Sequence, residues 1–325
     1  MLEMKEIAGL SERPHLENVS LVIGDYDRTR PLIDGRVKPD GINLRVTESG
    51  IANFCLRPIY EEYDVAEMSL SWYVMARLRD EPVIALPIFV LRMPVFGYVF
   101  VHKESRSEKP SDLVGARIAT SYYRLTVNLW LRGIFEEHYG LPNKQIHWVI
   151  TSGEEGAGYE IPAGTHVSRR PQQDPFALLE RGEVDAVFSP ELPEDFADCG
   201  SKVKHLFPDA LGETRRFFHA TGISPITHTI VVGRTFAAQR PQTARKLTNA
   251  FEEAQRICDE YWTDPKRLSF TEAAFFFRQQ RDIYGTDNYG HGIESNRKTL
   301  EAFVRYAHQQ RYINRVPSLD ELFFV

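Results

Sequence analysis

Side chains able to bind or protonate a ligand follow the first apolar run of the chain. Residues 21–24, LVIG, predict a buried strand, which opens into Asp25, Tyr26 and Arg28. In open α/β sheets, ligands bind beyond the carboxyl ends of strands, where turns and helix N-termini point their N–H groups. A capped, solvated turn explains an isolated strand end equally simply. Three further segments of the same kind favour a ligand site.

The second segment is EMSLS, residues 67–71, which precedes a helical pattern. Ser69 or Ser71 can cap that helix and leave backbone N–H groups for an anion. A plain cap is the simpler interpretation of the serines alone. A helix cap does not explain Glu67, because an acid near the end of a short buried strand needs a partner. We interpret it as a ligand acceptor or as a base toward a phenol.

The third segment contains Arg92, and the fourth begins with Arg124. Arg92 lies in LRMP between two apolar runs, a setting in which an arginine needs an anionic partner. An internal salt bridge to Glu67 or Asp25 and a ligand carboxylate explain it about equally well. Arg124, with Thr126, begins a long helical pattern. Arg132 lies two turns further on, so Arg124 is the better placed to contact a ligand.

His228 opens the apolar run HTIVV after a turn-forming segment. An imidazole titrates near neutral pH and therefore suits a proton donor. A hydrogen-bonded structural histidine is the usual alternative. The aromatic, glycine-containing segment 284–291 could fold over a site, but a surface loop is the favoured interpretation.

The composition sets the frame for these residues. The chain has 325 residues, of which 42% are hydrophobic and 26% charged, typical of a globular protein of about two domains. The net charge of −6 gives no bulk electrostatic reason for binding nucleic acid or an anionic membrane. A local arginine cluster can still bind a small anion. The three cysteines are far apart and predict neither a zinc site nor a disulfide framework.

Several classes of function lack sequence support. No apolar leader and no run of about 18 apolar residues is present, so we expect a cytoplasmic protein without a membrane partner. Histidine spacings typical of metal sites and the usual nucleotide and serine-hydrolase motifs are missing, so we expect no cofactor and no metal. A metal site assembled from distant residues, and homo-oligomerisation, stay open.

Apolar β-rich runs alternate with helical patterns, which indicates an α/β fold. The expected strands span residues 19–24, 42–47, 83–90, 96–102, 116–120, 145–151, 184–189 and 228–234. The expected helices span residues 125–139, 175–181, 241–262, 268–280 and 293–310.

Five segments together resemble the 4,5-dihydroxyphthalate decarboxylase family, and they run from the first strand almost to the C-terminus. They are GDYDRTRPLIDGRVKPDGINL, YDVAEMSLSWYVMARLRDEPVIALPIFVLRM, NLWLRGIFEEHYGL, TGISPITHTIVVGR and GIESNRKTLEAFVRYAHQQ. The resemblance implies a two-lobed fold of the type II periplasmic-binding-protein kind, with two crossing hinge strands and a ligand cleft between the lobes. Residues 1–95 plus 232–325 would form lobe I, and residues 96–231 lobe II. We expect the lobes to close by hinge motion.

The resemblance also implies roles for the candidate residues. The expected reaction is cofactor-independent decarboxylation of a hydroxylated aromatic carboxylate such as 4,5-dihydroxyphthalate. His228 in the implied cleft would protonate the ring carbon, and Glu67 or Asp25 would accept the phenolic proton. Arg28 and Arg92 would hold the carboxylate that stays, because clamping the departing one would stabilise the ground state.

The remaining candidates would complete substrate binding. They are Tyr26, Ser69, Ser71, Arg124 and Thr126, of which the last two sit where binding proteins of this fold hold carboxylates. The alternative function is a non-catalytic solute-binding protein for a small aromatic anion, since fold alone does not decide function.

Overall fold

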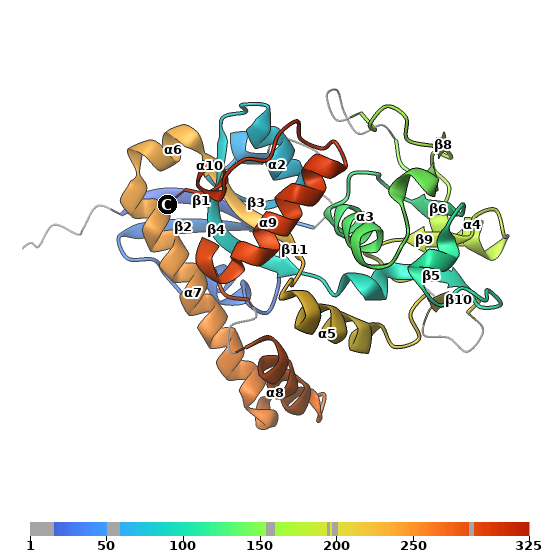
Figure 1. The fold of residues 1–325 in the computed structure, drawn as a ribbon. Helices are drawn as coiled ribbons and strands as arrows, with labels where there is room; N and C mark the ends of the chain where they lie inside the picture. The colour runs from blue at the N-terminus through green and yellow to red at the C-terminus, as the bar shows by residue number, and fades with distance from the viewer. Residues whose placement is uncertain are drawn as a thin grey trace, which may run out of the picture.

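Two mixed β-sheets, each flanked by helices, form two lobes that lie side by side (Figure 1). The computed structural model describes residues 16–50, 59–153, 160–193, 196, 201–285 and 289–324. The first sheet has the order β2-β1-β3-β11-β4 and the second has the order β10-β5-β9-β6-β7-β8. The expected α/β alternation is therefore confirmed.

The first sheet carries the candidate site. Its strands are β1 (Glu17–Ile23), β2 (Ile42–Glu48), β3 (Val65–Ser69), β4 (Val83–Arg92) and β11 (Ile226–Gly233). Strand β1 runs parallel to β2 and β3, whereas β11 is antiparallel to both β3 and β4. The helices of this lobe are α1 (Arg30–Ile33), α2 (Leu70–Leu78), α6 (Arg234–Gln239), α7 (Pro241–Thr263), α8 (Ala273–Tyr284), α9 (Ile293–Gln309) and α10 (Leu319–Leu322).

The second sheet consists of shorter strands. They are β5 (Val99–His102), β6 (Arg117–Thr120), β7 (His147–Ile150), β8 (Val167–Arg169), β9 (Ala186–Phe188) and β10 (Val203–His205). Its helices are α3 (Thr126–His138), α4 (Pro175–Glu180) and α5 (Ala210–Thr221). Short 3₁₀ turns occupy η2 (Ile59–Glu61), η3 (Val95–Tyr98), η4 (Pro110–Leu113), η5 (Asn143–Gln145) and η6 (Pro265–Arg267).

The chain crosses between the sheets twice, and the two crossings are neighbours. The first crossing is η3, between β4 and β5, and the second contains α5, between β10 and β11. Met93 N donates to Pro225 O at 3.4 Å, which joins the two connections where they leave the first sheet. The crossings are thus a short 3₁₀ turn and a helix rather than continuous strands. All of β11 pairs in the first sheet, so this sheet takes up the chain again at Ile226, ahead of the expected boundary at residue 232.

Strand β4 bulges away from β11 around Pro87. His228 pairs with Leu91 and Ile230 pairs with Leu86, so β4 has more residues between these two pairs than β11 has. Proline has no N–H to give to a ladder and is tolerated at edge strands and bulges. The freed backbone groups of residues 87–90 bond instead to side chains and loops of the candidate site.

The two lobes share one apolar core. A single cluster of buried side chains includes Met68 and Phe89 of the first lobe with Trp148 and Phe188 of the second. Helices α3 and α9 pack side by side across the lobe boundary, with the rings of Trp130 and Phe303 5.3 Å apart. Each fully buried side chain of this size contributes about 1.5–3 kcal/mol relative to exposure. Separating the lobes along this boundary would therefore cost several times this free energy.

The fit between α3 and α9 depends on a glycine. A Cβ atom at Gly133 would lie 2.3 Å from Cγ of Tyr306, so the aromatic ring needs the missing side chain. Gln310, just after α9, accepts from Arg132 Nε at 2.8 Å and donates to the carbonyl of Leu129 at 2.9 Å. Polar and apolar contacts thus both hold the lobes together. No described helix combines the length and apolar character needed to cross a lipid bilayer.

Candidate active site

A buried carboxylate, Glu67, stands at the centre of the candidate site. Its side chain is fully buried on β3, where the β1–β3–β11 pairing brings three donors to it. Oε2 accepts from the Gly24 N–H at 2.8 Å, and Oε1 accepts from the Tyr26 hydroxyl at 2.8 Å. His228 Nδ1 lies 2.5 Å from the same Oε1. Three donors satisfy a buried negative charge that would otherwise be costly.

The register of β11 explains why His228 reaches Glu67. His228 pairs with Ser69 and Ile230 pairs with Glu67, so the histidine and the acid are diagonal neighbours on one face of the sheet. An ionised carboxylate only accepts hydrogen bonds, which assigns the proton of this contact to Nδ1. Nε2 is then the ring nitrogen that can exchange a proton with a ligand.

Tyr26 folds back over the end of β1 to reach the same carboxylate. A Cβ atom at Gly24 would lie 2.5 Å from the Tyr26 hydroxyl oxygen, so only glycine allows this ring position. Burial, and then the charge of Glu67, raise the pKa of the Tyr26 phenol well above its usual range. The phenol therefore stays a hydrogen-bond donor at neutral pH.

Arg28 lies between two tyrosine rings. Its guanidinium carbon is 4.3 Å from the centre of the Tyr26 ring and 4.7 Å from that of Tyr289. Nε donates to the carbonyl of Val90, which the β4 bulge releases, and Nη1 contacts Asp27 at 3.2 Å. Nη2 is buried and has no hydrogen-bond partner within the part of the chain that the structure describes. A buried guanidinium nitrogen in this state is suited to a ligand carboxylate.

Arg92 lies at the junction of the two crossings, as its sequence position predicts. Nη1 donates to the Ser224 carbonyl at 3.0 Å, and Nη2 donates to Asn296 at the start of α9. Both acceptors are neutral. The expected internal partners have other contacts, because Glu67 bonds to the donors named above and Asp25 pairs with Arg30 near the surface.

The segment ahead of α9 packs against both arginines. Tyr289 stacks on Arg28 and its hydroxyl lies 3.4 Å from the Arg92 carbonyl oxygen. His291 Nδ1 accepts from the Phe89 N–H at 3.2 Å, again at the β4 bulge. Burial, with the charges of Arg92 and Arg28, lowers the pKa of His291 to about 4. The favoured surface-loop interpretation is therefore wrong for residues 289–291, whereas residues 286–288 lie outside the described parts of the chain.

The hydroxyl candidates bond to one another across the lobe boundary. Ser69 Oγ lies 2.7 Å and Ser71 Oγ 2.9 Å from Thr126 Oγ1, and Ser71 Oγ donates to the carbonyl of Arg124 at 2.9 Å. Ser69 occupies the N-cap position of α2, but its hydroxyl makes no capping bond, so that expectation is wrong. These buried hydroxyls tie α2 to the start of α3.

Neighbouring protein groups hold the Arg124 side chain. It contacts Met75 Sδ at 3.2 Å and the carbonyl of Glu160, and its guanidinium lies 4.6 Å from the Tyr312 ring centre. Its role in substrate binding stays a prediction. Among the described residues, no group of three or more His, Cys, Asp or Glu side chains is arranged to hold a metal ion.

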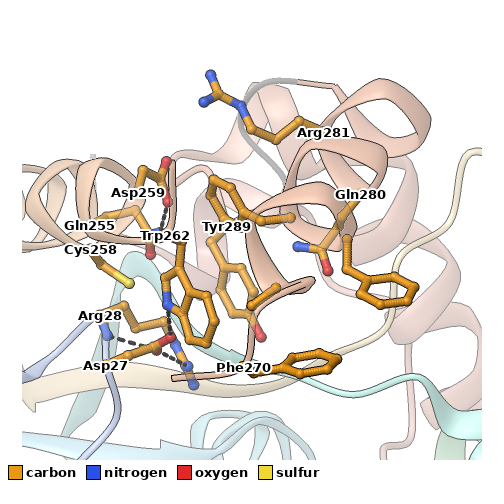
Figure 2. Close-up of a pocket in the computed structure, with 13 residues that line it drawn as sticks. Asp27, Arg28, Gln255, Cys258, Asp259, Trp262, Phe270, Gln280, Arg281 and Tyr289 are labelled. Carbon is orange, nitrogen blue, oxygen red and sulfur yellow. Dashed lines mark hydrogen bonds and ion pairs between the residues drawn. The ribbon is translucent and has the colours of Figure 1, made fainter. Parts of the chain in front are cut away.

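A cavity of about 420 Å³ has Arg28 in its wall (Figure 2). We call it the α7–α8 pocket, lined by Asp27 and Arg28, by Cys258 and Trp262 of α7, and by Phe276 and Gln280 of α8. Its size is typical of a small-molecule site. A second cavity of about 160 Å³, lined by Arg92 and Ser224, shares Gln280 and Tyr289 with it.

The sequence names Glu67, Tyr26, Arg28 and His228, which the structure brings together, but it does not predict the residues that surround them. Tyr289 and His291 belong to the aromatic, glycine-containing segment 284–291, for which the sequence favours a surface loop. Trp262 and Phe276 belong to helices whose patterns indicated only helix. A tryptophan at the end of an amphipathic helix was the one available signal.

Two curated relatives carry the name 4,5-dihydroxyphthalate decarboxylase. The protein from Comamonas testosteroni is 31% identical over 317 residues, covering 94% of this chain and 96% of its own length. The protein from Pseudomonas putida is 32% identical over 215 residues, covering 64% of this chain and 83% of its own length. No family model matches the chain.

The solved structures confirm the fold. A putative periplasmic sulfonate-binding protein from Methylobacillus flagellatus KT superposes with a TM-score of 0.60 at 15% identity, covering 96% of this chain and 92% of that one. The expected periplasmic-binding-protein-like architecture is therefore confirmed. The first relative matches nearly end to end at an identity that shows common family membership, so the chain belongs to the 4,5-dihydroxyphthalate decarboxylase family, which is a family of carboxy-lyase enzymes.

Proposed function

We propose that this protein releases CO₂ from a hydroxylated phthalate such as 4,5-dihydroxyphthalate, leaving 3,4-dihydroxybenzoate. The observation that carries the proposal is the Tyr26–Glu67–His228 group, a buried carboxylate that holds an imidazole by Nδ1 at the end of the first sheet. The family membership supports the reaction class, and this group supports the proton chemistry that the reaction needs.

The chemistry proceeds on the substrate itself. The hydroxyl para to one carboxylate pushes electron density onto the ring carbon that bears this carboxylate, and that carbon accepts a proton. The carbon–carboxylate bond then breaks, its electron pair restores the aromatic ring, and CO₂ leaves. The net change is one proton consumed for each CO₂ released.

His228 supplies the proton in this proposal. Doubly protonated His228 gives up its Nε2 proton, while Glu67 at Nδ1 carries the compensating charge and fixes the ring orientation. Glu67 is therefore a positioning residue rather than the base, because its two oxygens already accept three hydrogen bonds. Asp25, at the same strand end, stays the candidate acceptor of the phenolic proton.

Arg28 holds the carboxylate that the product keeps. Its buried Nη2 supports this role, and Arg92 on the other side of Tyr289 adds a second positive charge. Binding the retained carboxylate does not stabilise the departing one, so the clamp does not oppose the reaction.

The test combines product detection with a variant. Purified protein is incubated with 4,5-dihydroxyphthalate, and CO₂ and 3,4-dihydroxybenzoate are quantified. His228→Ala should lower kcat by about 10²–10⁴-fold while substrate affinity changes little. Binding without CO₂ release by the unmodified protein would favour the alternative of a solute-binding protein. Normal turnover in the folded variant would move the acid role to another residue.

A further inference from the structure

The described contacts leave little room for substrate access by separation of the lobes. The lobes share an apolar core, and the hydroxyls of Ser69, Ser71 and Thr126 bond across the boundary beside the catalytic group. Opening this boundary would expose Trp130 and break these buried bonds. A ligand that reaches Arg28 therefore needs another path.

The α7–α8 pocket provides such a path, because Arg28 is part of its wall. The guanidinium carbon of Arg28 also lies 4.3 Å from the ring centre of Tyr26, whose hydroxyl bonds to Glu67. The pocket and the proposed catalytic group are thus separated by one stacked side chain. Tyr289, which stacks on the same guanidinium, is also part of this wall.

The lining of the pocket matches an aromatic acid. The rings of Trp262, Phe270 and Phe276 line the pocket and offer apolar surface to a flat ligand. The Trp262 indole donates to Asp27 Oδ2 at 2.7 Å, which fixes this ring at the inner end (Figure 2). Arg28 and Arg281 supply positive charge in a lining that also holds the carboxylates of Asp27 and Asp259, and Arg28 keeps a buried Nη2 without a described hydrogen-bond partner. Aromatic stacking with a guanidinium clamp favours a planar anion over an aliphatic one.

We infer that the α7–α8 pocket admits and selects the aromatic carboxylate and delivers it to Arg28. This inference rests on the proposed function for the identity of the substrate. It assigns specificity to residues of α7 and α8 that take no part in the proton transfer. Two neighbouring phenylalanines of α8 make the assignment testable, since Phe276 lines the pocket whereas Phe275 lies outside its lining and is 66% exposed.

The experiment measures the binding of phthalate, which has no ring hydroxyl and is not turned over in the proposed mechanism. Isothermal titration compares the unmodified protein with Phe276→Ala and the matched control Phe275→Ala. We expect Phe276→Ala to weaken phthalate binding about three- to tenfold, because one aromatic contact is lost. Phe275→Ala should bind as the unmodified protein does.

A second pair of variants narrows the pocket instead of widening it. Gln280→Trp fills the junction between the two cavities, whereas Gln279→Trp adds the same ring on an exposed position of α8. Gln280→Trp should lower kcat/KM for 4,5-dihydroxyphthalate at least about tenfold with kcat nearly unchanged. The control should keep both constants.

The outcomes separate this inference from the proposed function. Equal phthalate affinity and equal kcat/KM in all four variants, with CO₂ still released, would overturn the pocket assignment and leave the function standing. Phthalate binding that Phe276→Ala weakens and Phe275→Ala does not, without CO₂ release by any protein, would overturn the function and support the pocket.

Discussion

Replacing Glu67 with glutamine tests the proton chemistry most directly. Oε1 of Glu67 faces two donors and Oε2 faces one. An amide can satisfy all three neighbours only if its oxygen faces the Gly24 N–H and its NH₂ group faces Tyr26 and His228. The tyrosine hydroxyl can turn to accept, but the histidine must then present an unprotonated Nδ1. Glu67→Gln thus forces the proton onto Nε2 and prevents the doubly protonated ring.

Two magnitudes follow from this geometry. The wrong tautomer removes the acid, so kcat should fall by about 10²–10⁴-fold, the usual value of positioned acid–base catalysis. Stability should fall far less, because each neighbour keeps a partner and only the charge assistance is lost. We expect a decrease of about 1.5–3 kcal/mol in the free energy of unfolding, as for one hydrogen bond to a charged group.

The assay measures CO₂ release under saturating substrate together with urea unfolding. Asp64→Asn is the matched control, since Asp64 Oδ2 accepts two hydrogen bonds from Ser20 at 2.8 Å each, away from His228. The control should lose stability but keep kcat. If folded Glu67→Gln retained kcat within about threefold, the role of His228 held by Glu67 would be refuted. A loss of activity equal in both variants would show a structural role only.

Three further results are expected. Arg28→Lys and Arg92→Lys should each weaken phthalate binding about tenfold in titration, because lysine lacks the planar fork, and unchanged affinity in both would contradict the clamp. The pKa of His291 is about 4 in the folded chain and near 6.5 in the unfolded chain, so the unfolded chain binds this proton first as the pH falls. Lowering the pH from 7 to 5 should therefore reduce the free energy of unfolding by about 2 kcal/mol through His291. His291→Gln should remove this part of the pH dependence in urea unfolding, and an unchanged slope would contradict the assignment. Small-angle scattering distinguishes the pocket route from the hinge closure that the family resemblance implies: we expect the same radius of gyration with and without phthalate, whereas compaction would show that the lobes do move.

The Tyr26, Glu67 and His228 candidates could be named from the sequence because each stands at or just after a recognisable strand. LVIG, the run before EMSLS, and HTIVV all indicate strands, and neighbouring strands bring their ends together at one sheet edge. The cleft that Glu67 and His228 share was expected from the family resemblance. The separate roles of the two side chains could not be predicted, because the register between β3 and β11 decides whether Glu67 contacts His228 or stays available as a base.

The surrounding walls could not be predicted because they depend on tertiary packing. The bulge at Pro87 arises from the mismatch between β4 and β11, which no local pattern shows. Helix α8 begins at Ala273 rather than at residue 268, because a 3₁₀ turn and the Ser- and Thr-containing segment before it adopt turns. The α7–α8 pocket forms where α7 and α8 pack beside Arg28 and Tyr289, an arrangement that no local pattern shows. The hydroxyls of Ser69 and Thr126 are typical anion ligands by type, yet their described bonds are to the protein.

The bulge in β4 also bears on how the molecule behaves in concentrated solution. β4 is an edge strand of the first sheet, and an exposed edge can recruit a strand from another chain. Here the backbone groups along that edge are already bonded within the molecule. The pairs are Ala85 O with Phe324 N, Pro87 O with Gly292 N, Phe89 N with His291, and Val90 O with Arg28. The contacts around the candidate site thus also cap this edge against intermolecular β-sheet growth, and substitutions that loosen them carry a risk of aggregation.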